Sequence, residues 1–147
     1  MSTDAAVKPS LTIKHRFKAA PEKVYQAWID PAKMSRWLGP PDVIEVTTTT
    51  DVRVGGRYTI QMIVPNDEHN VSGVYREIVP NRKLVFTWAW RSTPERESLV
   101  TVTFAPDGDG TWLTLHHEQF FDESARDRHE QGWKVIVPRL ETLFASE

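Results

Sequence analysis

The fold is decided by residues 83–90, which read Lys-Leu-Val-Phe-Thr-Trp-Ala-Trp. Bulky apolar side chains at Leu84, Phe86, Trp88 and Trp90 recur at every second position, a spacing that places them on one face of a β-strand. A strand with such a face must bury it against another element. The sequence therefore predicts a sheet with an aromatic inner face and a covering element elsewhere in the chain.

The same two-residue period continues on both sides of this strand. Further strands are expected near residues 43–50, 57–64, 72–79, 98–105 and 112–119. Short turns rich in Gly, Asn, Asp and Pro separate them, and connections this short make neighbouring strands antiparallel.

The orientation of the strand near residues 72–79 stays open. Either Val74 and Ile78 face the core, or Gly73, Tyr75 and Glu77 do. The other strands have clear apolar faces, formed by Tyr58, Ile60, Met62 and Val64, by Val100, Val102 and Phe104, and by Leu113 and Leu115. Trp112 falls on the opposite face of its strand.

The N-terminal part begins with an alternating strand at residues 11–18 and then changes to a helical period. Pro21 is expected to open a first short helix. Asp30 caps a second helix, because its side chain accepts a hydrogen bond and a proline follows it. Gly39 ends the second helix in the left-handed conformation, and the two prolines after it prevent continuation.

The C-terminal segment from Asp122 to Phe144 is expected to be one long helix. Asp122 is its N-cap, and a kink is expected near residues 134–138 because Pro138 cannot donate a backbone hydrogen bond. One apolar stripe runs along it, formed by Trp133, Ile136, Val137, Leu140, Leu143 and Phe144. It is the only element with enough apolar length to cover the sheet.

The fold class is therefore α+β, with the order strand, two short helices, six strands, long helix (β-α-α-β6-α). We expect a curved antiparallel sheet of about seven strands wrapped around the C-terminal helix. Residues 11–147 form one domain, and residues 1–10 form a disordered arm.

Composition excludes several classes of protein. The chain has 147 residues and no cysteine, which excludes disulfides, thiolate zinc sites and iron–sulfur clusters. Its formal net charge of -2, with interspersed signs, argues against nucleic-acid binding. No apolar run is long enough to span a membrane and no signal pattern is present, so a cytoplasmic protein is expected.

Apart from His117, the polar motifs predict no metal, no cofactor and no catalytic group. His116 and Glu118 share one strand face but form only half a metal site. Residues 107–110, Asp-Gly-Asp-Gly, lack the twelve-residue frame of a calcium loop and are expected to be a hairpin turn. Asp51 and Arg53 are expected to form an ion pair at a turn.

His117 is a polar group on an apolar strand face, and two interpretations stay open. It is either a core histidine with satisfied hydrogen bonds, or a ligand-binding group or general base with Glu77 or His129 beside it.

Seven stretches, in this order and spacing, resemble a known family over residues 11–145. They are Pro21-Glu22-Lys23-Val24-Tyr25 with Trp28 and Asp30-Pro31, Arg36-Trp37, residues 51–56, residues 73–80, residues 84–88, residues 110–117 and residues 129–133. The chain resembles the activator of heat-shock protein 90 ATPase homologue family of the SRPBCC superfamily, which includes START and birch-pollen-allergen-like proteins.

The resemblance implies a helix-grip fold with a cavity between the sheet and the C-terminal helix, and cytoplasmic proteins that often bind small molecules. Two positions depart from the family pattern: Leu38 replaces the second of two tryptophans, and Val54 replaces a turn proline. The eukaryotic co-chaperone that names the family carries a separate N-terminal domain, for which this chain leaves no room. We therefore favour a small-molecule ligand over a chaperone partner.

The predicted function is binding of a small apolar or aromatic ligand in that cavity. One alternative is a cyclase-like or hydrolase-like enzyme that uses His117 or Glu77, and another is a module that activates a chaperone ATPase. An enzymatic function is the less favoured hypothesis, and whether the protein forms a homodimer is left open. The predicted ligand-binding residues are Trp37, Tyr58, Ile60, Met62, Trp88, Trp90, Val102, Phe104, Leu115, His117, Trp133 and Val137.

Overall fold

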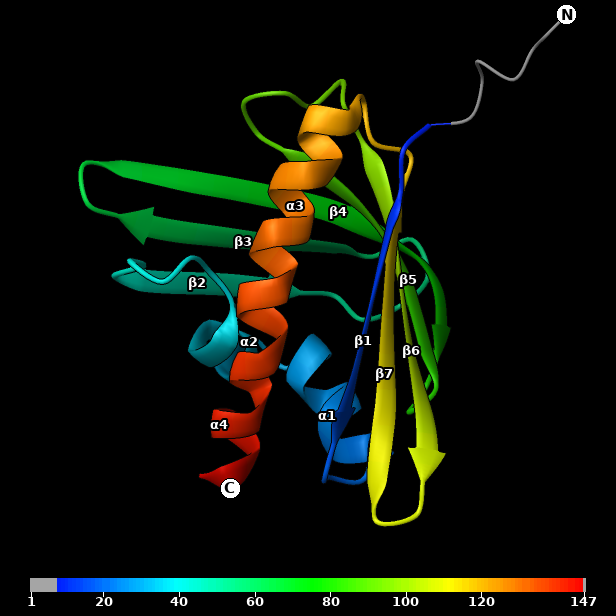
Figure 1. The fold of residues 1–147 in the computed structure, drawn as a ribbon. Helices are drawn as coiled ribbons and strands as arrows, with labels where there is room; N and C mark the ends of the chain where they lie inside the picture. Colours follow the sequence, from blue (N-terminus) through cyan, green and yellow to red (C-terminus); the bar gives the residue numbers. More distant parts are fainter. Residues whose placement is uncertain (1–7, 147) are drawn as a thin grey trace, which may run out of the picture.

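The computed structural model describes residues 8–146 and arranges them as one sheet with helices against its concave face (Figure 1). The strands are β1 (Leu11–Phe17), β2 (Glu45–Thr50), β3 (Arg57–Val64), β4 (Asp67–Val79), β5 (Lys83–Trp90), β6 (Ser98–Asp107) and β7 (Gly110–Glu118). The helices are α1 (Pro21–Ile29), α2 (Pro31–Trp37), α3 (Glu123–Ile136) and α4 (Leu140–Ala145), with a 3-10 turn at Val137–Arg139.

The seven strands lie in the order β1-β7-β6-β5-β4-β3-β2, and every neighbouring pair is antiparallel. The predicted α+β architecture is therefore confirmed. β4 begins at Asp67, earlier than the expected residue 72, because Asn66 adopts a φ of 66° and makes a tight turn directly after β3. The arm predicted for residues 1–10 lies mostly outside the described residues.

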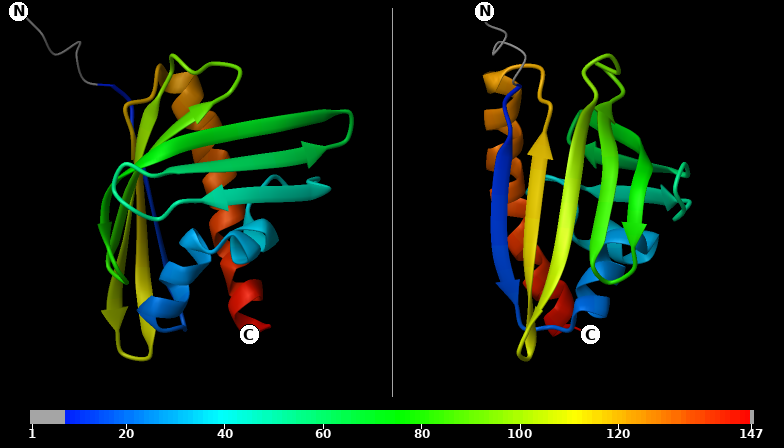
Figure 2. Two further views of the ribbon diagram at one scale, coloured as in Figure 1. Left: turned by 180° about the vertical axis from the view of Figure 1, so that it is seen from behind. Right: turned by 90° about the vertical axis from the view of Figure 1, so that its right-hand side faces the viewer.

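The sheet curves most strongly at β4, and Figure 2 shows β2 and β3 running in a different direction from β1 and β7. Gly73 lets β4 and β5 approach closely, since an added Cβ atom would lie 1.9 Å from the carbonyl oxygen of Thr87. A β-bulge follows between Tyr75 and Glu77.

This bulge explains the open orientation of β4. Gly73 and Tyr75 face the core, whereas Glu77 beyond the bulge is exposed and Ile78 packs partly against the core. Each of the two predicted alternatives therefore applies to one part of the strand.

The C-terminal segment crosses the concave face, as Figure 1 shows for α3 and α4. Asp122 caps α3 as predicted, because its carboxylate accepts from the backbone N–H of Ala125 at 2.8 Å. Pro138 lies in the 3-10 turn that separates α3 from α4, so the irregularity falls at residues 137–139. No helix within residues 8–146 is long and apolar enough to cross a membrane.

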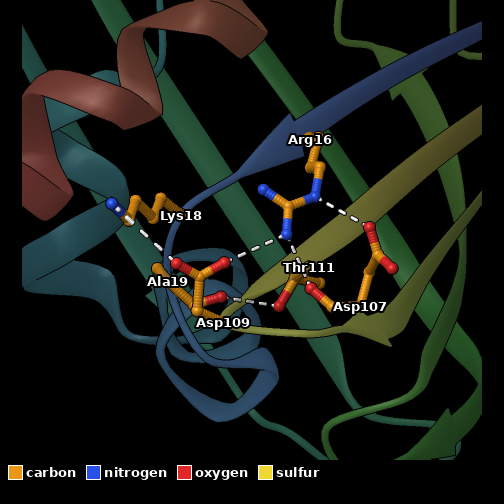
Figure 3. Close-up of polar contacts among 6 residues, drawn as sticks. All are labelled: Arg16, Lys18, Ala19, Asp107, Asp109 and Thr111. Atoms are coloured by element: carbon orange, nitrogen blue, oxygen red, sulfur yellow. Dashed lines mark hydrogen bonds and ion pairs between the residues drawn. The ribbon is translucent and has the colours of Figure 1, made fainter.

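The acidic turn after β6 is a hairpin, as predicted, and it binds β1 rather than forming a cation loop (Figure 3). The Arg16 guanidinium donates to the Asp107 carboxylate at 2.8 Å and to the Asp109 carboxylate at 3.2 Å. The Thr111 hydroxyl donates to the Ala19 carbonyl at 2.7 Å. These contacts fix the edge strand and the start of α1 to the same end of the sheet.

Candidate functional site

A cavity of about 680 Å³ lies between α3 and the concave face of the sheet. Its walls come from α3, from β3 and β5, and from the connections that follow α2, β5 and β7. We call it the main cavity. Its apolar lining consists of Leu38, Pro40, Pro41, Ile60, Met62, Trp88, Trp90, Phe120, Phe121, Ala125, Trp133, Val135 and Ile136.

Three tryptophans form an aromatic wall of the main cavity. The Trp88 ring lies 5.2 Å from the Trp133 ring and 5.6 Å from the Trp90 ring, measured between centroids. Separations of this size are typical of packed aromatic pairs. The cavity is open to solvent on the side of Phe121 and Val135, which are exposed at 57% and 47%.

Five of the twelve predicted ligand-binding residues line the main cavity. These are Ile60, Met62, Trp88, Trp90 and Trp133. The structure places the other seven on the same inner side of the protein but away from this cavity: Trp37, Tyr58, Val102, Phe104, Leu115, His117 and Val137.

Several of these seven residues lie away from the main cavity because α1 and the end of the C-terminal segment pack against that part of the sheet. Phe104 packs edge-on against Tyr25 of α1, with centroids 5.6 Å apart. Val102, Leu115 and Val137 are fully buried in the same core. A two-residue period assigns a side chain to a face of the sheet but not to a position along it.

Trp37 has a structural task at the junction of the first two helices. Its indole N–H donates to the Ala27 carbonyl at 2.7 Å. That carbonyl would normally accept from the residue four positions later, but Pro31 has no N–H. Trp37 therefore supplies the donor that Pro31 lacks, inside a fully buried environment.

Tyr58 lines a second, much smaller void of about 20 Å³ beside the main cavity. Trp28 and Trp88 also line it, and the indole N–H of each is buried without an acceptor among the described residues. A volume of this size holds about one water molecule.

His117 lies behind the cavity wall with both ring nitrogens hydrogen-bonded. Trp133 Nε1 donates to His117 Nδ1 at 3.1 Å. Since an indole N–H can only donate, Nδ1 carries no proton, and the proton must be on Nε2. Nε2 then donates to the Ser98 hydroxyl at 2.7 Å, and Ser98 donates to the Trp88 carbonyl at 3.1 Å.

This environment keeps the His117 ring neutral. Burial holds the pKa of His117 well below the ordinary value of 6.5, and His129 and His116 lower it further by repulsion. The ring has no exposed surface. The geometry matches a core histidine with satisfied hydrogen bonds.

His129 forms a second pair of this kind, on the lining of the main cavity. Trp90 Nε1 donates to His129 Nε2 at 2.9 Å, so the proton is on Nδ1, which donates to the Ala125 carbonyl at 2.7 Å. Burial lowers the pKa of His129, and Arg128 lowers it further against the opposing effect of the bond to Ala125. Both histidines therefore accept from a tryptophan of the wall.

Glu77 does not join His117, although one interpretation of the sequence placed them together. It pairs with Val85, in the row of residues that leads to His116 on the outer face of the sheet. Its carboxylate lies 3.3 Å from the Lys83 ammonium, and both side chains are partly exposed.

His116, weighed as half of a metal site, and Asp51, expected in a turn ion pair, each have a hydrogen-bond partner within the protein. His116 Nδ1 bonds the Thr12 hydroxyl at 2.9 Å. Asp51 accepts from Arg53 Nε at 2.9 Å, the turn ion pair that was expected. Among residues 8–146, no three His, Asp or Glu side chains are grouped as a metal would require.

Sequence reasoning missed the part of the lining that comes from connections and from the polar side of α3. Phe120 and Phe121 lie between β7 and α3, and Arg96 lies between β5 and β6. Connections have no period from which a direction can be inferred. The one sequence signal for this part of the lining was the pair Phe120 and Phe121, two large apolar residues directly before the Asp122 helix cap.

Comparisons with known proteins place the chain in one family. The family model for "Activator of Hsp90 ATPase homolog 1-like protein" matches residues 18–145. Activator of 90 kDa heat shock protein ATPase homolog 1 of Homo sapiens is 25% identical over 125 residues, which are 84% of this chain and 33% of that protein. The chain thus spans about a third of the length of that relative.

Two solved structures extend the similarity to three dimensions. The AHSA1 protein from Silicibacter pomeroyi is 28% identical, with a TM-score of 0.80 over 93% of this chain and 98% of that one. The Mll3558 protein from Rhizobium loti is 31% identical, with a TM-score of 0.74 over 91% of this chain and 95% of that one.

Proposed function

The chain belongs to the family of Activator of Hsp90 ATPase homolog 1-like proteins, and from this premise we propose that it binds a small apolar or aromatic ligand in the main cavity. The observation that carries the proposal is the 680 Å³ cavity with its wall of Trp88, Trp90 and Trp133. Ligand pockets in proteins have volumes of roughly 300–1,000 Å³ and mostly apolar walls with a few polar groups.

The polar groups of the lining support binding rather than acid–base catalysis. His129 has both nitrogens engaged, and its unprotonated Nε2 already accepts from Trp90. His117 is engaged in the same way and does not line the cavity. An enzyme that uses His117 and Glu77 as acid and base therefore gains no support from this geometry. The cytoplasmic location stays a prediction from the sequence.

Tryptophan fluorescence tests ligand binding directly, because bound rings or chains would contact three tryptophans. A panel of fatty acids, sterols, flavonoids and polyketides is titrated into the protein, and adducts are counted by native mass spectrometry. Quenching should decrease in Trp90→Phe and persist in Trp112→Phe, since Trp112 is 43% exposed on the outer face. Unchanged emission together with no adduct across the panel would refute the proposal.

A second candidate is a module that activates a chaperone ATPase. It is favoured by the similarity to the human relative, whose name describes that activity. The test is the ATPase rate of a purified Hsp90-type chaperone with and without this protein. If the Trp90→Phe variant stimulates the ATPase as strongly as the unsubstituted protein does, the activity does not depend on the main cavity. If the unsubstituted protein does not stimulate the ATPase, the result counts against this second function.

A further inference from the structure

The charge of the main cavity's lining differs from that of the chain as a whole. The chain carries a formal net charge of -2, with 20 acidic residues against 18 basic ones. Within the described residues, Arg96 and Arg128 line the cavity and no Asp or Glu does. A ligand in this space therefore meets positive charge and an apolar wall.

Arg96 is held at the open side of the cavity by an aromatic ring. Its guanidinium carbon lies 3.9 Å from the centre of the Phe121 ring, a close cation–π contact. Its ion pair is with the adjacent Glu95, at 3.9 Å between two partly exposed side chains. Such exposed pairs are weak, so the edge of the guanidinium remains free to bind another anion.

Arg128 provides a second cation from α3. Its Nη1 donates to the neutral Ser124 hydroxyl at 2.7 Å. Within residues 8–146 it has no carboxylate at ion-pair distance, whereas the nearby Arg126 is paired with Asp127 at 2.6 Å. Of these two arginines of α3, Arg128 lines the cavity and has no carboxylate partner among the described residues, whereas Arg126 is paired and does not line it.

We propose, as a refinement that rests on the proposed function, that the ligand is an amphipathic anion. Its apolar or aromatic body lies against Trp88 and Trp133, and its carboxylate, sulfonate or similar acidic group lies at the open side, where Arg96 and Arg128 bind it. Guanidinium groups bind such anions by paired, charge-assisted hydrogen bonds. An acidic group at the open side also keeps part of its hydration, which avoids the cost of full burial.

Two matched fluorescent probes test this inference: 8-anilinonaphthalene-1-sulfonate, and N-phenyl-1-naphthylamine, which has the same ring system without the sulfonate. We expect the original chain to bind the anionic probe about tenfold more tightly than the neutral one at low salt. The double variant Arg96→Gln, Arg128→Gln should lose this preference while its affinity for the neutral probe stays within about twofold. Arg126→Gln, on the same helix but outside the lining, is the control.

Each result has a defined meaning. Equal affinity for the two probes, or a preference that survives in the double variant, would overturn the inference while leaving ligand binding intact. Failure of both probes to bind would overturn the proposed function as well. If Arg126→Gln loses the preference for the anionic probe as completely as the double variant does, the preference comes from the general charge of α3. That result would also overturn the inference.

Discussion

Trp133 Nε1 donates to His117 Nδ1 across 3.1 Å and so joins α3 to β7 directly behind the wall of the main cavity. A parallel contact joins Trp90 Nε1 to His129 Nε2 at 2.9 Å. In each pair the indole is the donor, so each ring nitrogen that accepts must lack a proton. The two pairs fix the rings on both sides of the cavity wall without introducing charge.

The first prediction concerns which ring nitrogen of each histidine carries the proton. We expect the proton of His117 on Nε2 and that of His129 on Nδ1, both in the neutral form at pH 7. Long-range ¹H–¹⁵N correlation spectra distinguish the two tautomers by their nitrogen shifts. A protonated Nδ1 in His117 would contradict the assigned hydrogen bond.

The second prediction concerns the pH dependence of stability. Burial lowers the pKa of both histidines below 6.5, so the unfolded chain takes up protons first as the pH falls. Stability should be full above about pH 6.5 and should fall below it, with a slope of up to about 1.4 kcal/mol per pH unit from His117, whose pKa lies well below 6.5, and a smaller contribution from His129. Chemical denaturation between pH 5 and about 8 measures this, since most carboxylates protonate at lower pH.

The variant His117→Gln gives the control for this pH profile. It lacks the ring whose pKa is lowered most and should lose the larger part of the slope. A free energy of unfolding that does not change between pH 5 and about 6.5 would show that the rings are not buried in neutral form.

The third prediction compares two tryptophans that pack against each other, with ring centroids 4.7 Å apart. Trp37→Phe removes the donor to the Ala27 carbonyl, whose usual helical partner is missing at Pro31. Trp28→Phe removes an indole N–H that has no acceptor among the described residues. The loss of unfolding free energy should be larger in Trp37→Phe by about 1–3 kcal/mol. Equal losses would contradict the capping role of Trp37.

The fourth prediction uses two glycines in different surroundings. Gly73→Ala would place its Cβ atom 1.9 Å from the Thr87 carbonyl oxygen, so it should cost about 3 kcal/mol or more. Gly132→Ala meets no atom within 4 Å and lies inside α3, so it should stabilise the fold by up to about 1 kcal/mol. Thermal and urea unfolding of both variants checks this. Similar stabilities would show that β4 and β5 do not approach closely at Gly73.

The sequence predicted most of the fold because the signals involved are local. The alternation in β5, the Asp30 and Asp122 caps and the effect of Pro138 all depend on neighbouring residues. The inner face of β4 could not be decided, because the bulge between Tyr75 and Glu77 exchanges the two faces within one strand.

The candidate site was predicted only in part, for a related reason. Ile60 and Trp88 were identified because their strand face is also the cavity side. Phe104 shares that orientation, but Tyr25 of α1 fills the space in front of it. Whether a side chain faces a cavity or another side chain depends on contacts between distant segments, and these are not encoded in the period of one strand.

The most direct measurement for the central claim is ligand affinity in Gly132→Leu. Gly132 lines the main cavity, and an added Cβ atom there meets nothing within 4 Å. Leucine at this position should occupy cavity space without disturbing the core, and its higher helix propensity should keep the melting temperature equal or higher. We predict that affinity for any ligand found by the fluorescence titration decreases roughly tenfold or more, as measured by calorimetry. Unchanged affinity in a folded Gly132→Leu variant would show that the ligand binds elsewhere.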